Sequence, residues 1–102
     1  MKRTLEHIDY KKSTEELAMF AKALAHPTRI AILKHLENQT CCFTGDLVEV
    51  FPLAQSTISQ HLKELKDAGL IQGELKPPKI KYCINQSNWN KAKDLFTDFF
   101  NE

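Results

Sequence analysis

The segment Leu53–Ile71 carries two contrasting sets of side chains at helical spacing. The apolar set consists of Ala54, Ile58, Leu62 and Leu65. The polar set consists of Ser56, Thr57, Ser59, Gln60, Lys63 and Lys66. An apolar stripe of this kind packs on a core, whereas short hydroxyl and amide groups can exchange hydrogen bonds with base edges and phosphates in a DNA major groove. The segment therefore predicts a DNA recognition helix, with an ordinary amphipathic surface helix as the alternative.

Length and composition limit the remaining possibilities. The chain has 102 residues, of which 42% are hydrophobic and 26% are charged, as expected for one globular domain. The formal net charge is only +1, so any affinity for nucleic acid must come from lysines placed in and just after the recognition segment. The chain has no apolar run near the ~18 residues that a membrane span requires.

The start of the chain and its cysteines indicate a compartment. Residues 1–12 are charged and have no apolar stretch behind them, so we expect an N-terminal arm rather than a secretory signal. The three cysteines cannot all pair within one chain, which favours the reducing cytoplasm.

A catalytic pair of Cys42 with His26 or His35 is the enzyme alternative. The sequence offers no element to position these two side chains and no glycine-rich phosphate loop to support them. We therefore expect no enzyme.

Helical periodicity and end signals divide the chain into short elements. The expected elements are helices over 14–24, 27–38, 44–51 and 54–69, a strand over 40–43, and a last helix from 87 or 88 onward. Ser13 and Glu16 have the form of a capping box ahead of the first helix. Pro27 suits the first turn of the second helix, and Thr44 can cap the third. Gly69 marks the end of the recognition helix.

Residues 71–84 predict a β-hairpin with one buried face. Its alternating residues are Ile80, Tyr82 and Ile84 on one face and Lys79, Lys81 and Cys83 on the other. Pro77 and Pro78 stiffen the turn, and the lysines beside them can reach phosphate, although a plain hairpin has the same pattern. The fold class expected for residues 13–102 is mainly α with a small β-hairpin, a winged helix-turn-helix of about five helices.

The last helix is too apolar for a free surface. Its apolar residues are Trp89, Ala92, Leu95, Phe96, Phe99 and Phe100. A patch of this width needs a partner. The first helix, with Leu17 and Phe20, is the candidate partner both within the chain and across a two-fold axis. We therefore expect a homodimer held together by the terminal helices.

Two stretches resemble the ArsR/SmtB family of bacterial winged helix-turn-helix repressors. They are Phe20–Leu33 (FAKALAHPTRIAIL) and Leu53–Ile71 (LAQSTISQHLKELKDAGLI). The resemblance implies a dimer that binds operator DNA and typically releases it when a metal, a metalloid or a thiol-reactive signal is sensed. Two-fold symmetry then requires an operator that is an imperfect palindrome.

Carried over by position, the resemblance implies two sets of DNA contacts. The recognition-helix set is Gln55, Ser56, Thr57, Ser59, Gln60 and Lys63. The wing set is Lys76, Lys79 and Lys81. His61 resembles the recognition-helix histidine of the family, which is more often a packing or backbone-bonding residue than a base reader. His26, just before Pro27, resembles a family residue at a helix start and is expected to cap that helix. A winged helix that binds protein instead of DNA is the alternative, because a fold does not determine a function.

The family's metal motifs are incomplete in this chain. Zinc sensors of the family use Asp and His on the terminal helix, where this chain offers Asp94 and Asp98 but no histidine, so we expect no zinc site. Arsenic sensors of the family use a Cys-x-Cys pair near the third helix, because trivalent arsenic favours about three thiolates. Here Thr44 stands where the second thiol is expected, so that motif is broken.

Strand pairing suggests a narrower thiol site. In winged helices the short strand before the third helix pairs with the second strand of the wing, which brings Cys83 near Cys41 or Cys42. Only one of these neighbours can face Cys83, because successive side chains on a strand point to opposite faces. Cys41, Cys42 and Cys83 are therefore the candidate effector thiols. Three interpretations stay open: a site for arsenite or another thiophilic metal ion, a redox switch, and reduced cysteines with no sensing role.

Overall fold

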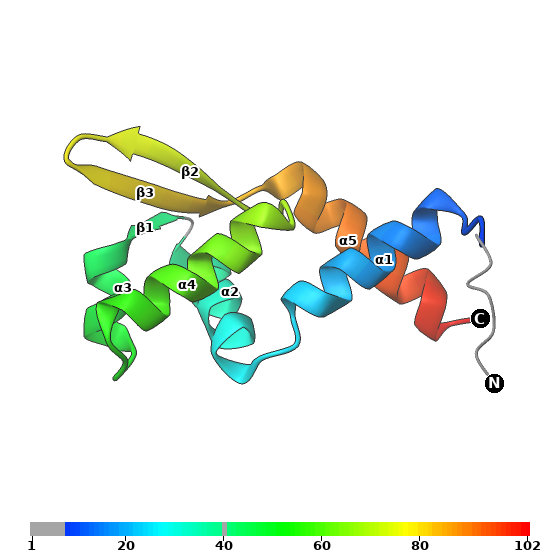
Figure 1. Ribbon diagram of the computed structural model, residues 1–102, viewed down its shortest axis with the longest axis horizontal. Coiled ribbons are helices and arrows are strands. Elements are labelled where there is room, and N and C mark those ends of the chain that lie inside the picture. The colour runs from blue at the N-terminus through cyan, green and yellow to red at the C-terminus, as the bar shows by residue number, and fades with distance from the viewer. Residues whose placement is uncertain (1–7, 40) are drawn as a thin grey trace, which may run out of the picture.

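The computed structural model describes residues 8–39 and 41–102. In chain order the elements are α1 (Lys12–Ala23), α2 (Pro27–Gln39), β1 (Cys41–Phe43), α3 (Thr44–Val50), α4 (Gln55–Asp67), β2 (Ile71–Lys76), β3 (Lys79–Ile84) and α5 (Gln86–Phe100). The body consists of α2, α3, α4 and a small sheet, while α1 and α5 lie together at the other end (Figure 1). This arrangement is the predicted winged helix-turn-helix.

A three-stranded antiparallel sheet joins the wing to the body. Its strand order is β1-β3-β2. The hairpin of β2 and β3 runs from the pair Ile71↔Ile84 to the pair Lys76↔Lys79 and turns through Pro77-Pro78. Strand β1 pairs with β3 and sets Cys41 opposite Cys83. The predicted pairing of the short strand with the second strand of the wing is therefore confirmed.

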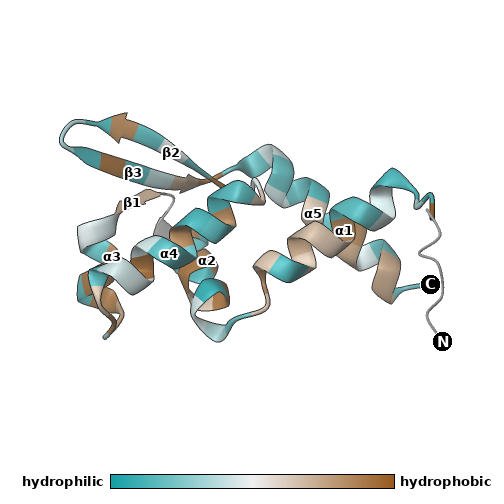
Figure 2. Ribbon diagram, viewed as in Figure 1, coloured by the Kyte–Doolittle hydropathy of each residue, from teal (hydrophilic) through white to brown (hydrophobic). Residues whose placement is uncertain are grey.

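The predicted buried face of the hairpin exists only at its base. Ile71 is 2% exposed, but Leu75 is 68% exposed and Ile80 is 41% exposed. Hydrophobic and hydrophilic residues still alternate along the outer half of both strands (Figure 2). The prediction fails there because the hairpin extends beyond the helical body (Figure 1).

The core forms around the inner side of α4. Ile58, Leu62 and Leu65 of α4 are each 0% exposed. They belong to one cluster with Ile32 and Leu36 of α2, Leu47 of α3 and Leu70. Burying a side chain of this size contributes about 1.5–3 kcal/mol. Ala54 does not belong to this buried stripe, because it is the exposed, extended N-cap residue of α4.

Helix α4 ends in a Schellman motif. Gly69 has a φ of +82°, a left-handed conformation that glycine adopts without a steric cost. Its N–H donates to the Lys66 carbonyl at 2.9 Å, and the N–H of Leu70 donates to the Leu65 carbonyl at 3.1 Å. The Asn88 side chain of α5 donates to the Gly69 carbonyl at 2.9 Å. The end of the recognition helix is thereby joined to the start of the last helix.

The two terminal helices pack on each other within the chain. Lys91 of α5 forms an ion pair with Glu16 of α1. Trp89 Nε1 donates to Glu37 of α2 at 3.2 Å, and Ala92 is buried with 4% exposure. The prediction that the first helix covers the last one within the chain is confirmed.

Two predicted helix starts are wrong. Helix α1 begins at Lys12, so Ser13 lies inside the helix and forms no capping box. Thr44 is the first helical residue of α3 rather than its cap. The Asp46 carboxylate accepts from the N–H of Phe43 at 3.0 Å and supports that helix start instead.

The last helix also begins earlier than predicted, at Gln86. The Asn85 side chain accepts from the N–H of Asn88 at 3.2 Å, and this cap starts the helix one or two residues before the predicted position. The recognition helix is shorter than the predicted segment and spans Gln55–Asp67.

Position 40 of the predicted strand lies outside the described residues. In the described parts of the chain, no helix has the length and apolar character needed to cross a membrane.

Replacing Gly69 by alanine should destabilise the protein. The new Cβ would lie 2.8 Å from Asn88 Nδ2 and would force a left-handed conformation on a residue that disfavours it. We expect the free energy of unfolding to fall by about 1–3 kcal/mol in urea titrations at fixed protein concentration. Gly45→Ala is the matched control, because a Cβ at Gly45 meets nothing within 4 Å. An equal loss of stability in both variants would contradict this account of the α4–α5 junction.

Candidate DNA interface and cysteine pair

The outer side of α4 is polar and open. All six recognition-helix residues predicted to contact DNA are exposed: Gln55, Ser56, Thr57, Ser59, Gln60 and Lys63. The burial of Ile58, Leu62 and Leu65 on the opposite side holds this face outward. Gln60 Nε2 donates to Glu64 at 3.1 Å, an exposed contact that a stronger hydrogen-bonding partner can replace.

A groove of about 460 Å³ separates the start of α4 from the wing. Its lining residues are Phe43, Thr44, Gly45, Asp46, Gln55, Ser59, Pro78, Lys79, Ile80 and Tyr82. Two of the predicted helix contacts and one predicted wing contact therefore line the same groove. Because residues of both α4 and the wing line this groove, a polymer lying across the start of α4 could also reach the wing.

Most of the predicted phosphate-binding lysines have exposed partners in the free protein. Lys63 Nζ lies 2.8 Å from the Asp67 carboxylate, and this hydrogen bond raises the pKa of the Lys63 ammonium. Lys76 Nζ lies 3.3 Å from Glu74, and Lys79 Nζ lies 5.4 Å from the centre of the Phe43 ring. Exposed ion pairs of this kind are weak, so a phosphate can take the place of either carboxylate.

His61 does not share the exposure of its neighbours on α4. It is 8% exposed, and its Nδ1 accepts a hydrogen bond from Arg29 Nε at 3.1 Å. Burial first, and then the neighbouring His26 and Arg29, lower the pKa of the His61 ring. His26 Nδ1 accepts from the N–H of Thr28 at 3.0 Å and thereby caps α2. Both histidines therefore accept hydrogen bonds within the chain, His61 at a buried position and His26 at an exposed one.

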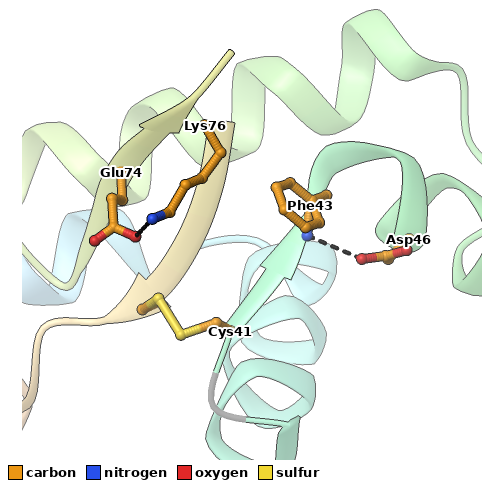
Figure 3. Close-up of a disulfide and its surroundings, with 6 residues drawn as sticks. Cys41, Phe43, Asp46, Glu74 and Lys76 are labelled. Carbon is orange, nitrogen blue, oxygen red and sulfur yellow. Dashed lines mark hydrogen bonds and ion pairs between the residues drawn. A yellow bond between two sulfur atoms is a disulfide. The ribbon is translucent and has the colours of Figure 1, made fainter. Parts of the chain in front are cut away.

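Cys41 and Cys83 form a disulfide between β1 and β3, with their Cα atoms 4.2 Å apart (Figure 3). The two residues are direct partners in the strand register. Phe43, two residues along β1, shares their face and lies opposite Lys81. The bond therefore lies on the face of the sheet opposite the buried Cys42, two residue pairs along the strands from the wing lysine Lys81.

Cys42 is separated from this pair. It is 7% exposed, belongs to the core cluster, and lies opposite Tyr82 in the register. Burial, with a smaller effect from Asp46, raises the pKa of the Cys42 thiol and so reduces its reactivity. The structure thus brings together two of the three candidate thiols. In the described ranges, no group of three or more His, Cys, Asp or Glu side chains is arranged to hold a metal ion.

The residues predicted to form a dimer interface differ in exposure. Phe20 is 2% exposed and packs in the core of its own chain, and Leu17, Trp89, Leu95 and Phe96 are partly buried. Phe99 and Phe100 at the end of α5 are 53% and 75% exposed. Met19 on α1 is also exposed, at 42%.

Sequence reasoning missed several residues of this region. Arg29 contacts the recognition helix, yet the contact joins positions 32 residues apart and has no local signal. Thr44 and Gly45 line the groove because α3 starts beside the wing. A helix start next to a lysine-bearing hairpin could have suggested this pair, but only once the topology was known.

The fold and the exposed polar helix define a winged helix-turn-helix regulator. Residues 26–72 match the family model described as "Bacterial regulatory protein, arsR family". The chain is 35% identical to the HTH-type transcriptional regulator YgaV of Escherichia coli (strain K12), over 76% of this chain and 79% of that relative. It is 32% identical to the arsenical resistance operon repressor of Staphylococcus xylosus, over 88% of this chain and 78% of that relative.

A solved structure shows the same likeness. The ArsR-like transcriptional regulator from Rhodococcus sp. RHA1 superposes with a TM-score of 0.74 at 25% identity, over 87% of this chain and 83% of that one. The chain therefore belongs to the ArsR family of bacterial regulatory proteins, and the resemblance found in the sequence is confirmed. It is a transcriptional repressor of the ArsR/SmtB type and not an enzyme.

Proposed function

We propose that this protein binds a palindromic operator as a homodimer, with α4 in the major groove and the wing against the flanking backbone. The exposed polar face of α4 carries the proposal, since all six of its predicted contact side chains are exposed and two of them, Gln55 and Ser59, line the same groove as the wing lysine Lys79. Amide and hydroxyl groups can read base edges, and the lysines can neutralise phosphates.

The homodimer follows from the apolar end of α5. Phe99 and Phe100 expose large aromatic surfaces at the end of α5, and Phe99 lines one hollow together with Leu17 of α1. A soluble monomer rarely leaves such a patch uncovered, and a second copy of the same patch covers it symmetrically. Two α4 helices related by a two-fold axis would then enter successive major grooves about 34–36 Å apart. We propose that the regulator works in the cytoplasm, where its operator is located.

The effector site that we propose is the pair Cys41 and Cys83. A specific observation favours a redox signal, because the two sulfurs are already close enough to be bonded and the third thiol faces the core. Cytoplasmic disulfides are usually transient or redox-sensing. Arsenite, the alternative effector, would find two thiolates here instead of the three that it favours.

The proposed switch acts through the sheet. A peroxide transfers one oxygen to a thiolate, giving after proton uptake a sulfenic acid and water or an alcohol. The second thiol then attacks the sulfenic sulfur, and the sulfenic hydroxyl leaves with the thiol proton as one water molecule, forming the disulfide. The new bond ties β3 of the wing to β1, which leads directly into α3 and then α4. We infer that the bond fixes the wing and prevents it from adjusting to the DNA, so the oxidised form releases the operator.

Gln60→Glu should weaken operator binding without unfolding the protein. The change places a negative charge where base acceptors and phosphates would lie, and we expect Kd to rise about ten- to hundredfold. Fluorescence anisotropy on the DNA upstream of the protein's own gene measures this effect. Gln86→Glu on α5 is the matched control, because that exposed glutamine also bonds a residue four positions on, Asn90.

Salt dependence checks the same proposal. If each protomer neutralises about three to five phosphates, log affinity should fall against log salt with a slope of roughly −5 to −9. A folded protein that binds no palindromic fragment, or that binds with no salt dependence, would contradict the DNA proposal and favour a protein-binding module.

The thiol pair should couple to DNA affinity. We expect peroxide-oxidised protein to bind the upstream fragment at least about fivefold more weakly than reduced protein. Cys41→Ser and Cys83→Ser should abolish the difference, and Cys42→Ser is the control that should keep it. The same series with arsenite added to reduced protein tests the alternative effector. Equal affinities for oxidised and reduced wild type would rule out the redox switch.

A further inference from the structure

The strongest unassigned feature is a polar cluster around the buried His61, which joins α4 to α2 and to the end of α1. His61, in the middle of α4, is the only buried polar or charged side chain in the part of the chain that the structure describes. Arg29 in the first turns of α2 donates from Nε to His61 Nδ1 at 3.1 Å, and its Nη1 lies 3.4 Å from the carbonyl of Ala23, the last residue of α1. One guanidinium therefore contacts both α4 and α1.

His26 completes the cluster from the connection between α1 and α2. Its ring centre lies 4.4 Å from that of His61. Its Nδ1 is occupied by the N–H of Thr28, which fixes the ring at the start of α2. The cluster thus lies where the helix that carries the proposed dimer interface meets the helix that carries the proposed DNA contacts.

The contact of Arg29 with His61 requires a neutral imidazole. Arginine has only donors and keeps its charge, so the Nδ1 atom that it contacts must be without a proton. Protonation of His61 would place a donor against a donor and a cation against a cation at a partly buried contact. Protonation would therefore remove the acceptor at His61 Nδ1 and break its hydrogen bond with Arg29.

The surrounding charges oppose that protonation. Burial, His26 and Arg29 all lower the pKa of His61 from its usual 6.5, and Glu64 of the same helix acts weakly in the opposite direction. Lys22 of α1 lines one hollow together with Glu64. Glu64 is the carboxylate that raises the pKa of His61, and the ammonium of Lys22 therefore lies near it.

We propose that Arg29 and His61 are positioning residues, which hold the recognition helix against α1 only while the His61 ring is neutral. The proposal rests on the proposed DNA-binding function and deepens it. A homodimer must present two α4 helices at a fixed separation, and the Arg29 contact is the polar link between α4 and the end of α1. Acidification should therefore weaken specific DNA binding.

This sign is opposite to the general electrostatic effect. Protonating histidines makes a protein more positive, which strengthens its attraction to DNA phosphates. A loss of affinity at low pH therefore identifies the positioning contact and is not produced by net charge.

The test compares three substitutions at constant ionic strength between pH 7.5 and pH 5.5. His61→Asn keeps an acceptor near Nδ1 but does not titrate, whereas His61→Phe keeps a ring and removes the acceptor. His35→Asn is the control, because His35 lies on α2 outside the cluster and packs against Phe51.

We expect wild-type affinity for the upstream fragment to fall about tenfold on acidification. The affinity of the His35→Asn variant should fall by the same factor. The affinity of His61→Asn should not change between the two pH values, and His61→Phe should bind the fragment weakly at both.

Two readouts without DNA separate this proposal from the DNA proposal. First, ring ¹⁵N shifts should show the proton of neutral His61 on Nε2. Second, the free energy of unfolding of the wild type should fall as the pH drops below about 6.5, because His61 then binds a proton in the unfolded chain but not in the folded one. His61→Asn should reduce that fall. A proton on Nδ1 at pH 7.5, or a wild-type affinity that stays constant or rises at pH 5.5, would overturn the positioning role. If no DNA is bound at any pH, the DNA proposal fails, and the ring shifts and stability still decide whether the contact exists.

Discussion

The burial of one side of α4 is the constraint on which the rest of the structure depends. Ile58, Leu62 and Leu65 are fully buried against α2 and α3, and this packing leaves the hydroxyl and amide side chains of the same helix in solvent. Because the apolar stripe can dock in only one orientation, the polar face has a defined direction. The wing then matters because it stands next to that face and encloses a groove with it.

Contacts at the middle and the end of α4 make this orientation specific. Arg29 holds its middle through His61, and Asn88 contacts the carbonyl of Gly69 just beyond its end. The first contact leads to α1 and the second to α5, so both terminal helices are joined to the recognition helix. A change at the terminal helices can therefore reach the polar face of α4 through short polar contacts. The sheet offers a third connection, since β1 joins the wing to α3 and the disulfide lies within that pairing.

Periodicity was sufficient to predict the elements that bury a broad apolar face, and it predicted the two sides of α4 correctly except at Ala54. Helix starts were less predictable, because Ser13, Thr44 and Asn85 compete with nearby residues as caps and tertiary contacts decide between them. Strand alternation showed that only one of Cys41 and Cys42 could face Cys83. The choice between them depends on the register of β1 with β3, which no local pattern specifies. The contact of Arg29 with His61 was not predictable for the same reason, since it forms only when α2 and α4 pack together.

The central claim is that two α4 helices read successive major grooves. Methylation-protection footprinting of the reduced protein on the DNA upstream of its own gene tests it most directly, because this method reports major-groove positions. The account predicts two protected major-groove patches, related by a palindrome and centred about 34–36 Å apart. A single protected patch, or no protection from protein that is folded and in excess, would contradict it.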